Sequence, residues 1–299
     1  MKPELVILAA GLGSRYGGLK QVDAVGPSGE TIMEYSVYDA LRAGFGKVVF
    51  VIRKNIADDF RKTFTDKLAV NVPFEFAYQE LDMIPDGLVP PSGRVKPWGT
   101  GHAVMVAEDF IHAPFAVINA DDYYGPEAYQ SMAAFLSNEG NDTSYAMAGY
   151  ALGNTLSPHG FVSRGICEAD DDNKLLGITE RTKIRFSEGR IIAGEGENQI
   201  PLSENAIVSM NFWGFRPFFF TRLKELFTEF MKTGKDQLTA EFYLSTAIDT
   251  LIQHGQATVE VLKTNASWFG VTYQEDRAAV INNIRNLIGQ GLYPERLWH

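Results

Sequence analysis

Two basic residues beside a group of glycines near the start of the chain suit phosphate chemistry. The segment reads GLGSR over residues 11–15 and continues to Lys20. Glycine lets backbone N–H groups approach an anion without a side chain in the way. Arginine binds as a bidentate fork and lysine as a point charge, so Arg15 and Lys20 suit the charge that develops on oxygens during phosphoryl transfer. We therefore predict a phosphate-binding turn.

The spacing of the glycines excludes two common phosphate-binding loops. The dinucleotide fingerprint G-x-G-x-x-G needs a third glycine where this chain has Tyr16, and an acid where the second strand ends in Arg53 and Lys54. The P-loop G-x-x-x-x-G-K-[ST] needs lysine directly after its second glycine, but Leu19 intervenes and Gln21 follows the lysine. The turn therefore belongs to another class.

A pair of acids follows a later apolar run. Asp121 and Asp122 come directly after the strand that we predict over 114–120. Ligands of open α/β sheets gather at the carboxyl ends of the strands. Mg2+ binds one or two carboxylates and leaves its other positions to phosphate and water. An acid at this place therefore suits a magnesium ion that accompanies a nucleotide.

Strands that alternate with helices must position these groups. Apolar runs predict strands over 5–10, 47–52, 74–78 and 114–120. Helical spacing predicts helices over 31–43, 55–68, 101–109 and 126–139. This alternation predicts an α/β fold with a mostly parallel sheet and helices on both faces. Nearly continuous apolar strands agree with burial on both sides of the sheet.

The rest of the chain is richer in strands. We predict strands over 142–150, 161–168, 175–179, 206–215 and 258–262, a hairpin or flap over 181–200, and helices over 218–234, 240–254 and 275–289. No linker or repeat is visible. We therefore expect a single domain over 1–299, with a nucleotide-binding half (1–140), a β-rich sugar-binding half (141–275) and a closing helix and tail (276–299).

Composition narrows the class of protein. The chain has 299 residues, 45% of them hydrophobic, and a net charge of -10. Proteins that bind nucleic acid usually carry a basic face, so we expect no such partner. The single Cys167 excludes an internal disulfide and a cysteine-rich zinc site. Neither a signal peptide nor an apolar run of about 18 residues is present, so we expect a cytoplasmic protein without membrane contact.

The first motif resembles the signature L-A-A-G-x-G-[ST]-R, followed by lysine, of the sugar-phosphate nucleotidyltransferases. The resemblance implies a Rossmann-like domain of the glycosyltransferase-A type, in which Arg15 and Lys20 are catalytic and straddle the reacting phosphates. The family usually has proline before the lysine, where this chain has Leu19, and a longer gap after the arginine. The residues that would wrap the base and triphosphate are Leu8, Ala9, Ala10, Gly11, Gly13 and Ser14.

The acid pair also resembles a motif of this family. Residues 119–125 (NADDYYG) are similar to its strand-end motif, which implies that Asp121 is the catalytic ligand of Mg2+ and that Asp122 lies beside it. A second metal acid is common in W-x-D-x-G-T-P-E-D, but Gly270 takes its place after Trp268. Asp122, Asn211, or phosphates and water are then the remaining ligands. A chain that has lost its chemistry is also consistent with this glycine.

Two further segments resemble those that bind the base and the sugar. Residues 98–104 (WGTGHAV) are similar to the G-T-G-H-A segment of N-acetylglucosamine 1-phosphate uridylyltransferases, which implies that Gly99, Thr100 and the upstream Gln79 contact the nucleotide. A glutamine carries a donor and an acceptor, so it can match uracil or thymine. We expect His102 to be structural or to orient substrate, and not to act as a base.

The sugar side resembles the family pattern Y-G-V…I-V-E-K-P. The resemblance implies that Gly160 and Glu180 hold the sugar and that Arg181 or Lys183 meets its phosphate. Asn211 lies in a segment similar to the strand that lines the sugar ring.

Together these motifs predict an enzyme that transfers a nucleoside monophosphate from UTP or dTTP to a sugar 1-phosphate with Mg2+. Two alternatives stay open: a nucleotidyltransferase for another acceptor such as phosphocholine, and an inactive sensor of sugar nucleotides. Homo-oligomer formation is also left open.

Overall fold

The central sheet joins the two halves of the sequence. The computed structural model describes residues 1–11, 24–65, 72–157, 159–233, 236–270 and 275–298, and within these ranges eleven strands form one sheet. Four parallel strands make up one side, in the order β4 (Phe115–Asn119), β1 (Glu4–Leu8), β2 (Lys47–Ile52) and β3 (Phe74–Tyr78). Most of their side chains are buried, as expected of parallel strands that are covered on both faces.

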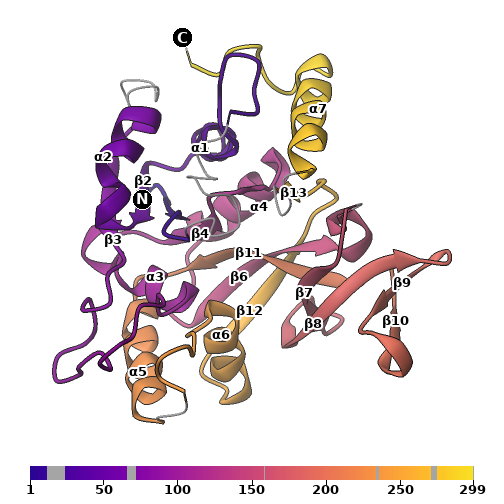
Figure 1. Cartoon of the computed structure of the whole chain (residues 1–299). Helices are drawn as coiled ribbons and strands as arrows, with labels where there is room; N and C mark the ends of the chain where they lie inside the picture. The colour runs from indigo at the N-terminus through magenta and orange to yellow at the C-terminus, as the bar shows by residue number, and fades with distance from the viewer. Residues whose placement is uncertain (12–23, 66–71, 158, 234–235, 271–274, 299) are drawn as a thin grey trace.

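The other side of the sheet is mixed and mostly antiparallel. β11 (Ile207–Phe215) is antiparallel to β4, β6 (Ser144–Ala151) and β7 (Val162–Ala169), and β12 (Thr258–Lys263) runs parallel to β6. The strands β8 (Leu175–Ser187), β9 (Arg190–Ala193) and β10 (Ile200–Leu202) continue the sheet beyond β7 and project from one end of the molecule (Figure 1). They form the hairpin that the polar, glycine-rich segment predicts.

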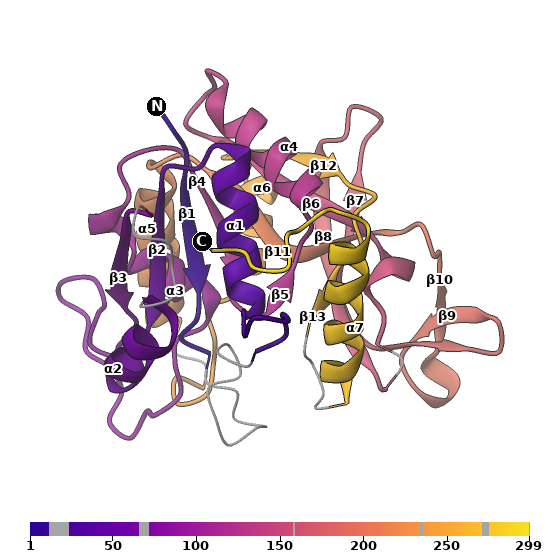
Figure 2. The same ribbon diagram turned by 90° about the horizontal axis from the view of Figure 1, so that it is seen from above.

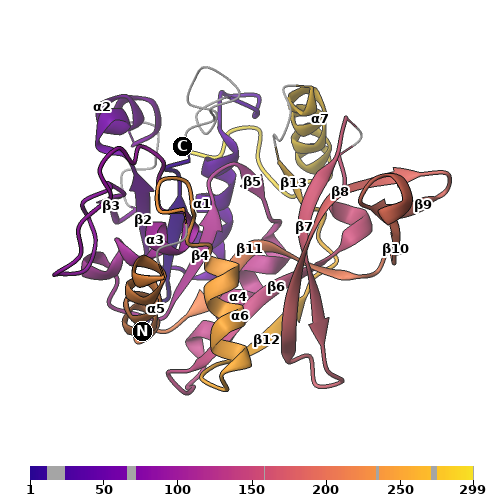
Figure 3. The same ribbon diagram turned by 60° about the horizontal axis from the view of Figure 1, so that its bottom comes forward.

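Helices cover both faces of the sheet. One face packs against α1 (Ile32–Ala43), α2 (Ala57–Phe60) and α4 (Pro126–Ser137). The opposite face packs against α3 (Thr100–Met105), α5 (Phe219–Lys232) and α6 (Leu244–Gln253), which lie in front of the sheet in Figure 3. Leu5 and Ile7 of β1 enter the first core and Val6 enters the second, because successive side chains of a strand alternate between its faces. The prediction of an α/β fold is confirmed.

The ends of α1 follow from its sequence. The Thr31 side chain accepts a hydrogen bond from the Glu34 N–H, and the Glu34 carboxylate accepts one from the Thr31 N–H, which forms a capping box. Gly44 ends the helix in the left-handed conformation (φ 101°), where a β-carbon is disfavoured.

The segment predicted as a helix over 55–68 is helical throughout its described part but changes helix type twice, and residues 66–68 lie outside the described residues. It is divided into a 3-10 turn (Lys54–Ile56), α2 and a π turn (Arg61–Thr65). No side chain caps the start of α2, and Phe60 and Phe64 both pack on the Phe50 ring. Packing onto β2 therefore outweighs regular helix geometry. Further 3-10 turns occur at Glu108–Phe110, Leu152–Thr155 and Gly196–Asn198.

A small sheet of two strands joins the end of β4 to the later part of the chain. β5 (Asp122–Tyr123) pairs with β13 (Phe269–Gly270), and the Tyr123 and Phe269 rings are stacked with centroids 4.3 Å apart. α7 (Asp276–Gly289) follows and packs in a third core together with residues of α1 (Figure 2). None of the helices in the described parts of the chain is long and apolar enough to cross a bilayer.

Candidate active site

A polar cavity of about 340 Å3 lies at the carboxyl end of β4, between that strand and the strands β7, β8 and β11. Its walls include Asp121, Asp122, Arg164, Glu180, Asn211 and Trp268. These residues come from five separate segments of the chain, and only the sheet brings them together. The position agrees with the rule that ligands of open α/β sheets bind at the carboxyl ends of the strands.

Asp122 is held in a fixed orientation although it is nearly buried. Its Oδ2 atom accepts a hydrogen bond from Asn119 Nδ2 at 2.8 Å and lies 3.3 Å from the Tyr124 hydroxyl. The Ser36 hydroxyl reaches the Asp122 carbonyl at 3.5 Å. Asp121, its neighbour, also lines the cavity. The two carboxylates are the acids that the strand-end motif predicts.

A chain of side-chain amides extends from Asp122 into the sheet. Asn211 Nδ2 donates to Asn119 Oδ1 at 2.7 Å, and Asn211 Oδ1 accepts from Trp213 Nε1 at 3.1 Å. Asn211 has a left-handed backbone (φ 64°) at an irregularity in the pairing of β11 with β6. Such irregularities redirect side chains, often beside active sites. The bulge in β11 therefore carries Asn211 into the cavity and orients Asp122 through Asn119.

Gly270 lies directly against this carboxylate. It pairs with Asp122 in the β5–β13 ladder, and a β-carbon on Gly270 would stand 2.6 Å from Asp122 Oδ1 and 3.1 Å from the Asp121 carbonyl oxygen. Real β-carbons essentially never approach another atom as closely as the first of these distances. The Asp122 carboxylate therefore occupies the space that a side chain at position 270 would need.

Arg164 is a cavity residue that the motifs do not predict. Its Nε donates to Thr155 Oγ1 at 3.3 Å, its Nη1 donates to the Ser163 carbonyl at 2.8 Å, and its guanidinium lies 4.7 Å from the centre of the Trp268 ring. Burial lowers the pKa of Arg164 to about 10, against the opposing effect of the Asp122 and Glu180 charges. The side chain is still a cation at neutral pH. Its only signal in the sequence is an arginine in a strand whose other residues, apart from Glu168, are small or apolar.

The pairing of β7 with β8 decides which glycine faces the acid on the sugar side. Gly165 is opposite Glu180 and lines the cavity, whereas Gly160 is not among the lining residues. A β-carbon on Gly165 would lie 2.8 Å from Ile178 Cγ2, so the site needs a glycine there. Removal from water raises the pKa of the Glu180 carboxyl, and the positive charge of Arg164 opposes this rise.

The two basic residues after Glu180 lie outside the cavity. Arg181 and Lys183 are exposed, and neither lines the cavity walls. Lys183 has a left-handed backbone (φ 56°), and its Nζ donates to the carboxylate of Glu195, which lies between β9 and β10. Arg164 is thus the buried cation that the described residues place in the cavity.

The glycine-rich turn begins beside the same edge of the sheet. Leu8 ends β1, Ala9 and Ala10 are buried, and Gly11 is exposed. The Ala9 N–H bonds to the Val51 carbonyl, which holds the start of the turn against the end of β2. Gly13, Ser14, Arg15 and Lys20 lie outside the described residues.

The GTG segment packs against the residues that precede α6. A β-carbon on Gly99 would lie 2.8 Å from the Phe242 carbonyl oxygen, and one on Gly101 would lie 2.6 Å from the Phe242 ring. Thr100 lines the cavity, and its Oγ1 accepts from the Leu244 N–H at 3.0 Å. The two glycines therefore allow close packing, and Thr100 is the member of the segment that reaches the cavity.

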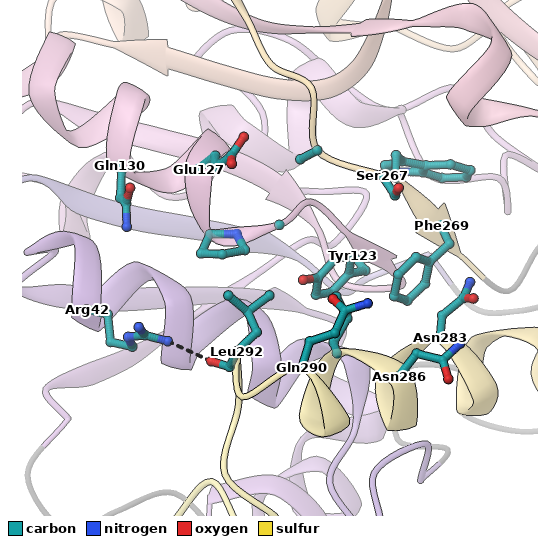
Figure 4. Close-up of a pocket in the computed structure, with 15 residues that line it drawn as sticks. Arg42, Tyr123, Glu127, Gln130, Ser267, Phe269, Asn283, Asn286, Gln290 and Leu292 are labelled. Atoms are coloured by element: carbon teal, nitrogen blue, oxygen red, sulfur yellow. Dashed lines mark hydrogen bonds between the residues drawn. The ribbon is translucent and has the colours of Figure 1, made fainter.

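A larger cavity of about 510 Å3 lies between α4, β13 and α7 (Figure 4). Its labelled side chains include Tyr123, Phe269 and several amides, and Arg42 closes one side through a hydrogen bond to the Leu292 carbonyl. Trp268 lines both cavities. The paired carboxylates lie in the smaller cavity, so the chemistry is assigned there.

An open α/β sheet with paired acids at the carboxyl end of a central strand can bind a ligand together with a divalent ion. The chain belongs to the nucleotidyl transferase family, whose sequence model matches residues 4–271. This match confirms the resemblance of the first motifs to nucleotidyltransferases. No curated protein matches the chain by sequence.

Solved structures share the fold at low sequence identity. The inositol-1-phosphate CTP transferase from T. maritima has a TM-score of 0.63 and 15% identity over 95% of this chain and 96% of that chain. A putative glucose-1-phosphate thymidylyltransferase from Bacillus anthracis has a TM-score of 0.66 and 14% identity over 95% of each chain. A UDP-glucose pyrophosphorylase has a TM-score of 0.59 and 16% identity over 96% of this chain and 99% of that chain. These likenesses confirm the fold.

Proposed function

We propose that the protein transfers UMP or dTMP from the nucleoside triphosphate to a sugar 1-phosphate and releases pyrophosphate. The observation that carries the proposal is the cavity at the end of β4, which combines the acids Asp121 and Asp122 with Arg164 and Glu180. Acids suit a divalent ion and hydroxyl groups, and a buried cation suits a phosphate. The solved structures of similar fold include proteins named for CTP, thymidylyl and UDP-glucose chemistry, so the choice of base rests on the resemblance of Gln79 and its neighbours.

The proposed reaction is a direct in-line displacement. An oxygen of the sugar 1-phosphate forms a bond to the α-phosphorus of the nucleoside triphosphate. The bond from that phosphorus to the oxygen that bridges the α- and β-phosphates breaks, and pyrophosphate leaves with the electron pair. A phosphate monoester has a second pKa of about 6 and is already ionised at neutral pH, so no protein base is needed. Catalysis then consists of positioning and charge neutralisation. The family resemblance assigns Arg15 and Lys20 to the reacting phosphates.

The acid pair fits a bound Mg2+. Asp121 and Asp122 would hold it as the one or two carboxylates that this ion prefers, and no third His, Cys, Asp or Glu joins them in a cluster among the described residues. When bound, the ion neutralises charge on the phosphate oxygens.

The position of Gly270 favours an active enzyme over an inactive sensor. The missing acid at this position is compensated if Asp122 supplies the second carboxylate from the other strand of the β5–β13 ladder. A β-carbon on Gly270 would lie 2.6 Å from Asp122 Oδ1, so the Asp122 carboxylate and a side chain at position 270 cannot occupy this place together. This steric exclusion supports the proposal that Asp122 supplies the carboxylate that position 270 lacks. A glycine at position 270 is then a requirement of the site and not a sign that the protein has lost its activity.

Arg164 and Glu180 are assigned to the acceptor. Arg164 is fixed by Thr155 and Ser163, so it can meet a phosphate without losing further side-chain entropy. Glu180 at the rim would accept hydrogen bonds from sugar hydroxyls, and Asn211 would face the sugar ring. The exposed positions of Arg181 and Lys183 favour Arg164 as the cation for the acceptor phosphate.

Pyrophosphate release tests the proposal. The purified protein is incubated with Mg2+ and UTP, dTTP or CTP, each against a panel of sugar 1-phosphates and against phosphocholine. Release with a sugar 1-phosphate that stops on addition of EDTA is the expected result. Release of pyrophosphate with phosphocholine and with no sugar 1-phosphate would mean that the acceptor is phosphocholine and not a sugar 1-phosphate. Nucleotide binding without pyrophosphate release from any pair of nucleotide and acceptor would overturn the proposal in favour of a sensor.

A further inference from the structure

The hydroxyl of Tyr293 lies between two buried side chains that come from distant parts of the chain. It donates to Asp39 Oδ2 at 2.6 Å, and it lies 2.8 Å from the hydroxyl of Tyr123. Asp39 belongs to α1 and Tyr123 to β5, and all three side chains are at most 3% exposed. Because the single proton of the Tyr293 hydroxyl is used on Asp39, the Tyr123 hydroxyl donates to Tyr293. The three groups therefore form one line of hydrogen bonds from β5 to α1.

The ring of Tyr293 is also held by α1. It packs edge-on against the rings of Tyr35 and Tyr38, with centroids 5.0 and 6.0 Å away. Tyr35, Tyr38 and Asp39 share one face of the helix, because residues three and four positions apart on a helix are neighbours. In the described parts of the chain Oδ1 of Asp39 has no hydrogen-bond partner, so the bond from Tyr293 is the one that satisfies this buried carboxyl. Both the ring and the hydroxyl of Tyr293 are thus fixed on α1.

The C-terminal tail, residues 290–298, lies across α1 (Figure 2). Arg42 Nη1, near the end of the helix, donates to the Leu292 carbonyl at 3.1 Å. Trp298 Nε1 donates to Glu34 Oε1, near the start of the helix, at 3.1 Å. These two bonds hold the tail on either side of its tyrosine. The tail is therefore attached to α1 by contacts that do not involve β5.

Tyr123 lies on the back of the small β5–β13 ladder. Neighbouring side chains of a strand point to opposite faces, so Tyr123 and Phe269 share the face away from Asp122. The rings of Tyr123 and Phe269 are stacked and line the larger cavity (Figure 4), whereas Asp122 lines the smaller one. The ladder therefore presents its carboxylate to the smaller cavity on one face and its aromatic pair to Tyr293 on the other.

The ladder is too short to be stable by its own hydrogen bonds. Each strand has two residues, and even a longer isolated pair of strands is only marginally stable in water without packing. Asn119 and Tyr124 orient the carboxylate of Asp122. The bond from Tyr123 to Tyr293 instead holds β5 itself against α1. A shift of Tyr123 would move Asp122 as well, because the two residues are joined by one planar peptide unit.

We infer that Tyr293 is a positioning residue for the acid pair: by holding Tyr123 on α1, it fixes the β5–β13 ladder and so the place at which Asp122 meets a divalent ion. This inference rests on the proposed function, which assigns Asp121 and Asp122 to that ion. It gives the C-terminal tail a part in the chemistry, although the described walls of the smaller cavity include no residue of the tail.

Binding of Mn2+ alone tests the inference without turnover. Mn2+ takes the same oxygen ligands as Mg2+, and its electron paramagnetic resonance signal reports the free ion. The binding that is lost in Asp121→Asn is assigned to the acid pair. Tyr293→Phe keeps the ring and removes the hydroxyl. We expect it to weaken this binding by about 10-fold, since removal of groups that orient metal ligands costs about 10- to 100-fold in affinity.

Trp298→Phe is the matched control for a loss of tail contacts. It removes the bond of the tail to Glu34 and leaves Tyr123 untouched. Thermal unfolding measures the loss of stability in each variant, and only Tyr293→Phe should bind Mn2+ more weakly. Asp39→Asn keeps an oxygen acceptor for the tyrosine and should bind Mn2+ as the wild type does. Equal Mn2+ affinity in Tyr293→Phe and Trp298→Phe would overturn the inference, because the tyrosine would then be merely structural.

A double-mutant cycle shows whether Tyr293 acts through Tyr123. Tyr123→Phe removes the other hydroxyl of the pair, and residues that act through one another have non-additive effects. We expect the double variant to bind Mn2+ no more weakly than the weaker of the two single variants. Losses of affinity that add up would overturn the inference, as would Mn2+ binding that does not depend on Asp121.

Pyrophosphate release, measured on the same proteins, separates the inference from the proposed function. Release by the wild type, with an unchanged Mg2+ dependence in Tyr293→Phe, would support the proposed function and overturn the inference. A 10-fold weaker binding of Mn2+ to Tyr293→Phe, as expected for an orienting group, without release by the wild type from any pair of substrates would support the inference and overturn the proposed function.

Discussion

Gly270 and Asp122 face each other across the β5–β13 ladder at a separation that excludes any side chain at position 270. A β-carbon there would come within 2.6 Å of Asp122 Oδ1 and within 3.2 Å of the Trp268 ring. The Asn119 amide and the Tyr124 hydroxyl hold the carboxylate from the other side, so it cannot simply move away. The orientation of the acid therefore depends on a residue more than a hundred positions later in the chain.

Gly270→Ala should lower turnover by about 100-fold, because a displacement of about 1 Å at a catalytic group costs on this order. Gly270→Asp, which restores the acid of the family pattern, should lower it at least as much. Steady-state assays of pyrophosphate release measure the effect. Gly289→Ala is the matched control, since a β-carbon on Gly289 would meet nothing within 4 Å. Normal activity of Gly270→Asp would contradict the assignment of Asp122.

Arg164→Lys should raise the KM for the acceptor by about 10- to 100-fold, because a hydrogen bond to a charged group contributes about 1.5–3 kcal/mol. Lysine keeps the charge but not the planar fork. Binding of the nucleoside triphosphate should change little. Arg181→Ala, at an exposed position outside the cavity, is the comparison and should have the smaller effect. The opposite order of the two variants would assign the acceptor phosphate to Arg181.

The contribution of Asp39 to the stability of the protein should decrease as the pH rises from about 4 to 7. Burial raises the pKa of this carboxyl from 3.8 to about 7, although the Tyr293 hydroxyl donates to it at 2.6 Å. The folded state therefore holds the proton more tightly than the unfolded state, so between about pH 4 and 7 the unfolded state is ionised while the folded state is still protonated, and stability falls until the folded carboxyl has also ionised. Asp39→Asn should be more stable than the wild type at pH 8 and no more stable at pH 4. Urea unfolding across this range measures the difference, and Asp58→Asn, at an exposed position, is the control substitution.

Thr31→Ala should destabilise the protein by about 1 kcal/mol, because it removes the side-chain oxygen that accepts the Glu34 N–H at 3.2 Å. Thr31→Ser keeps a hydroxyl in the same place and should retain most of that stability. Chemical denaturation of both variants gives the free energies of unfolding. Equal loss in the two variants would mean that packing of the threonine methyl, and not the cap, is responsible.

The regular elements could be predicted because their signals are local. The strands expected over 47–52 and 74–78 form over those residues, and β2, which is buried on both faces, leaves a short and nearly continuous apolar run. Helix α1 (Ile32–Ala43) matches the helix predicted over 31–43 to within one residue, because its caps, Thr31 and Gly44, act within one turn. The acid pair at the end of β4 could be found for the same reason.

The rest of the site depends on pairing between distant segments. β5 and β13 have two residues each, too few to leave any periodic pattern, and so the contact of Gly270 with Asp122 has no signature in the sequence. Gly160 and Gly165 both precede apolar residues, and only the register of β7 against β8 shows that Gly165 faces Glu180. Arg164 enters the site by that same register.

Trp268 is a wall shared by both cavities, and the Arg164 guanidinium lies over its ring. Trp98 and Trp213 lie deeper in the protein, away from the walls of these two cavities. Occupation of either cavity must therefore change the surroundings of this one indole more than those of the two buried ones. Trp268 is thus an intrinsic fluorescent probe, and tryptophan fluorescence can be used to titrate ligands that bind without being converted to product.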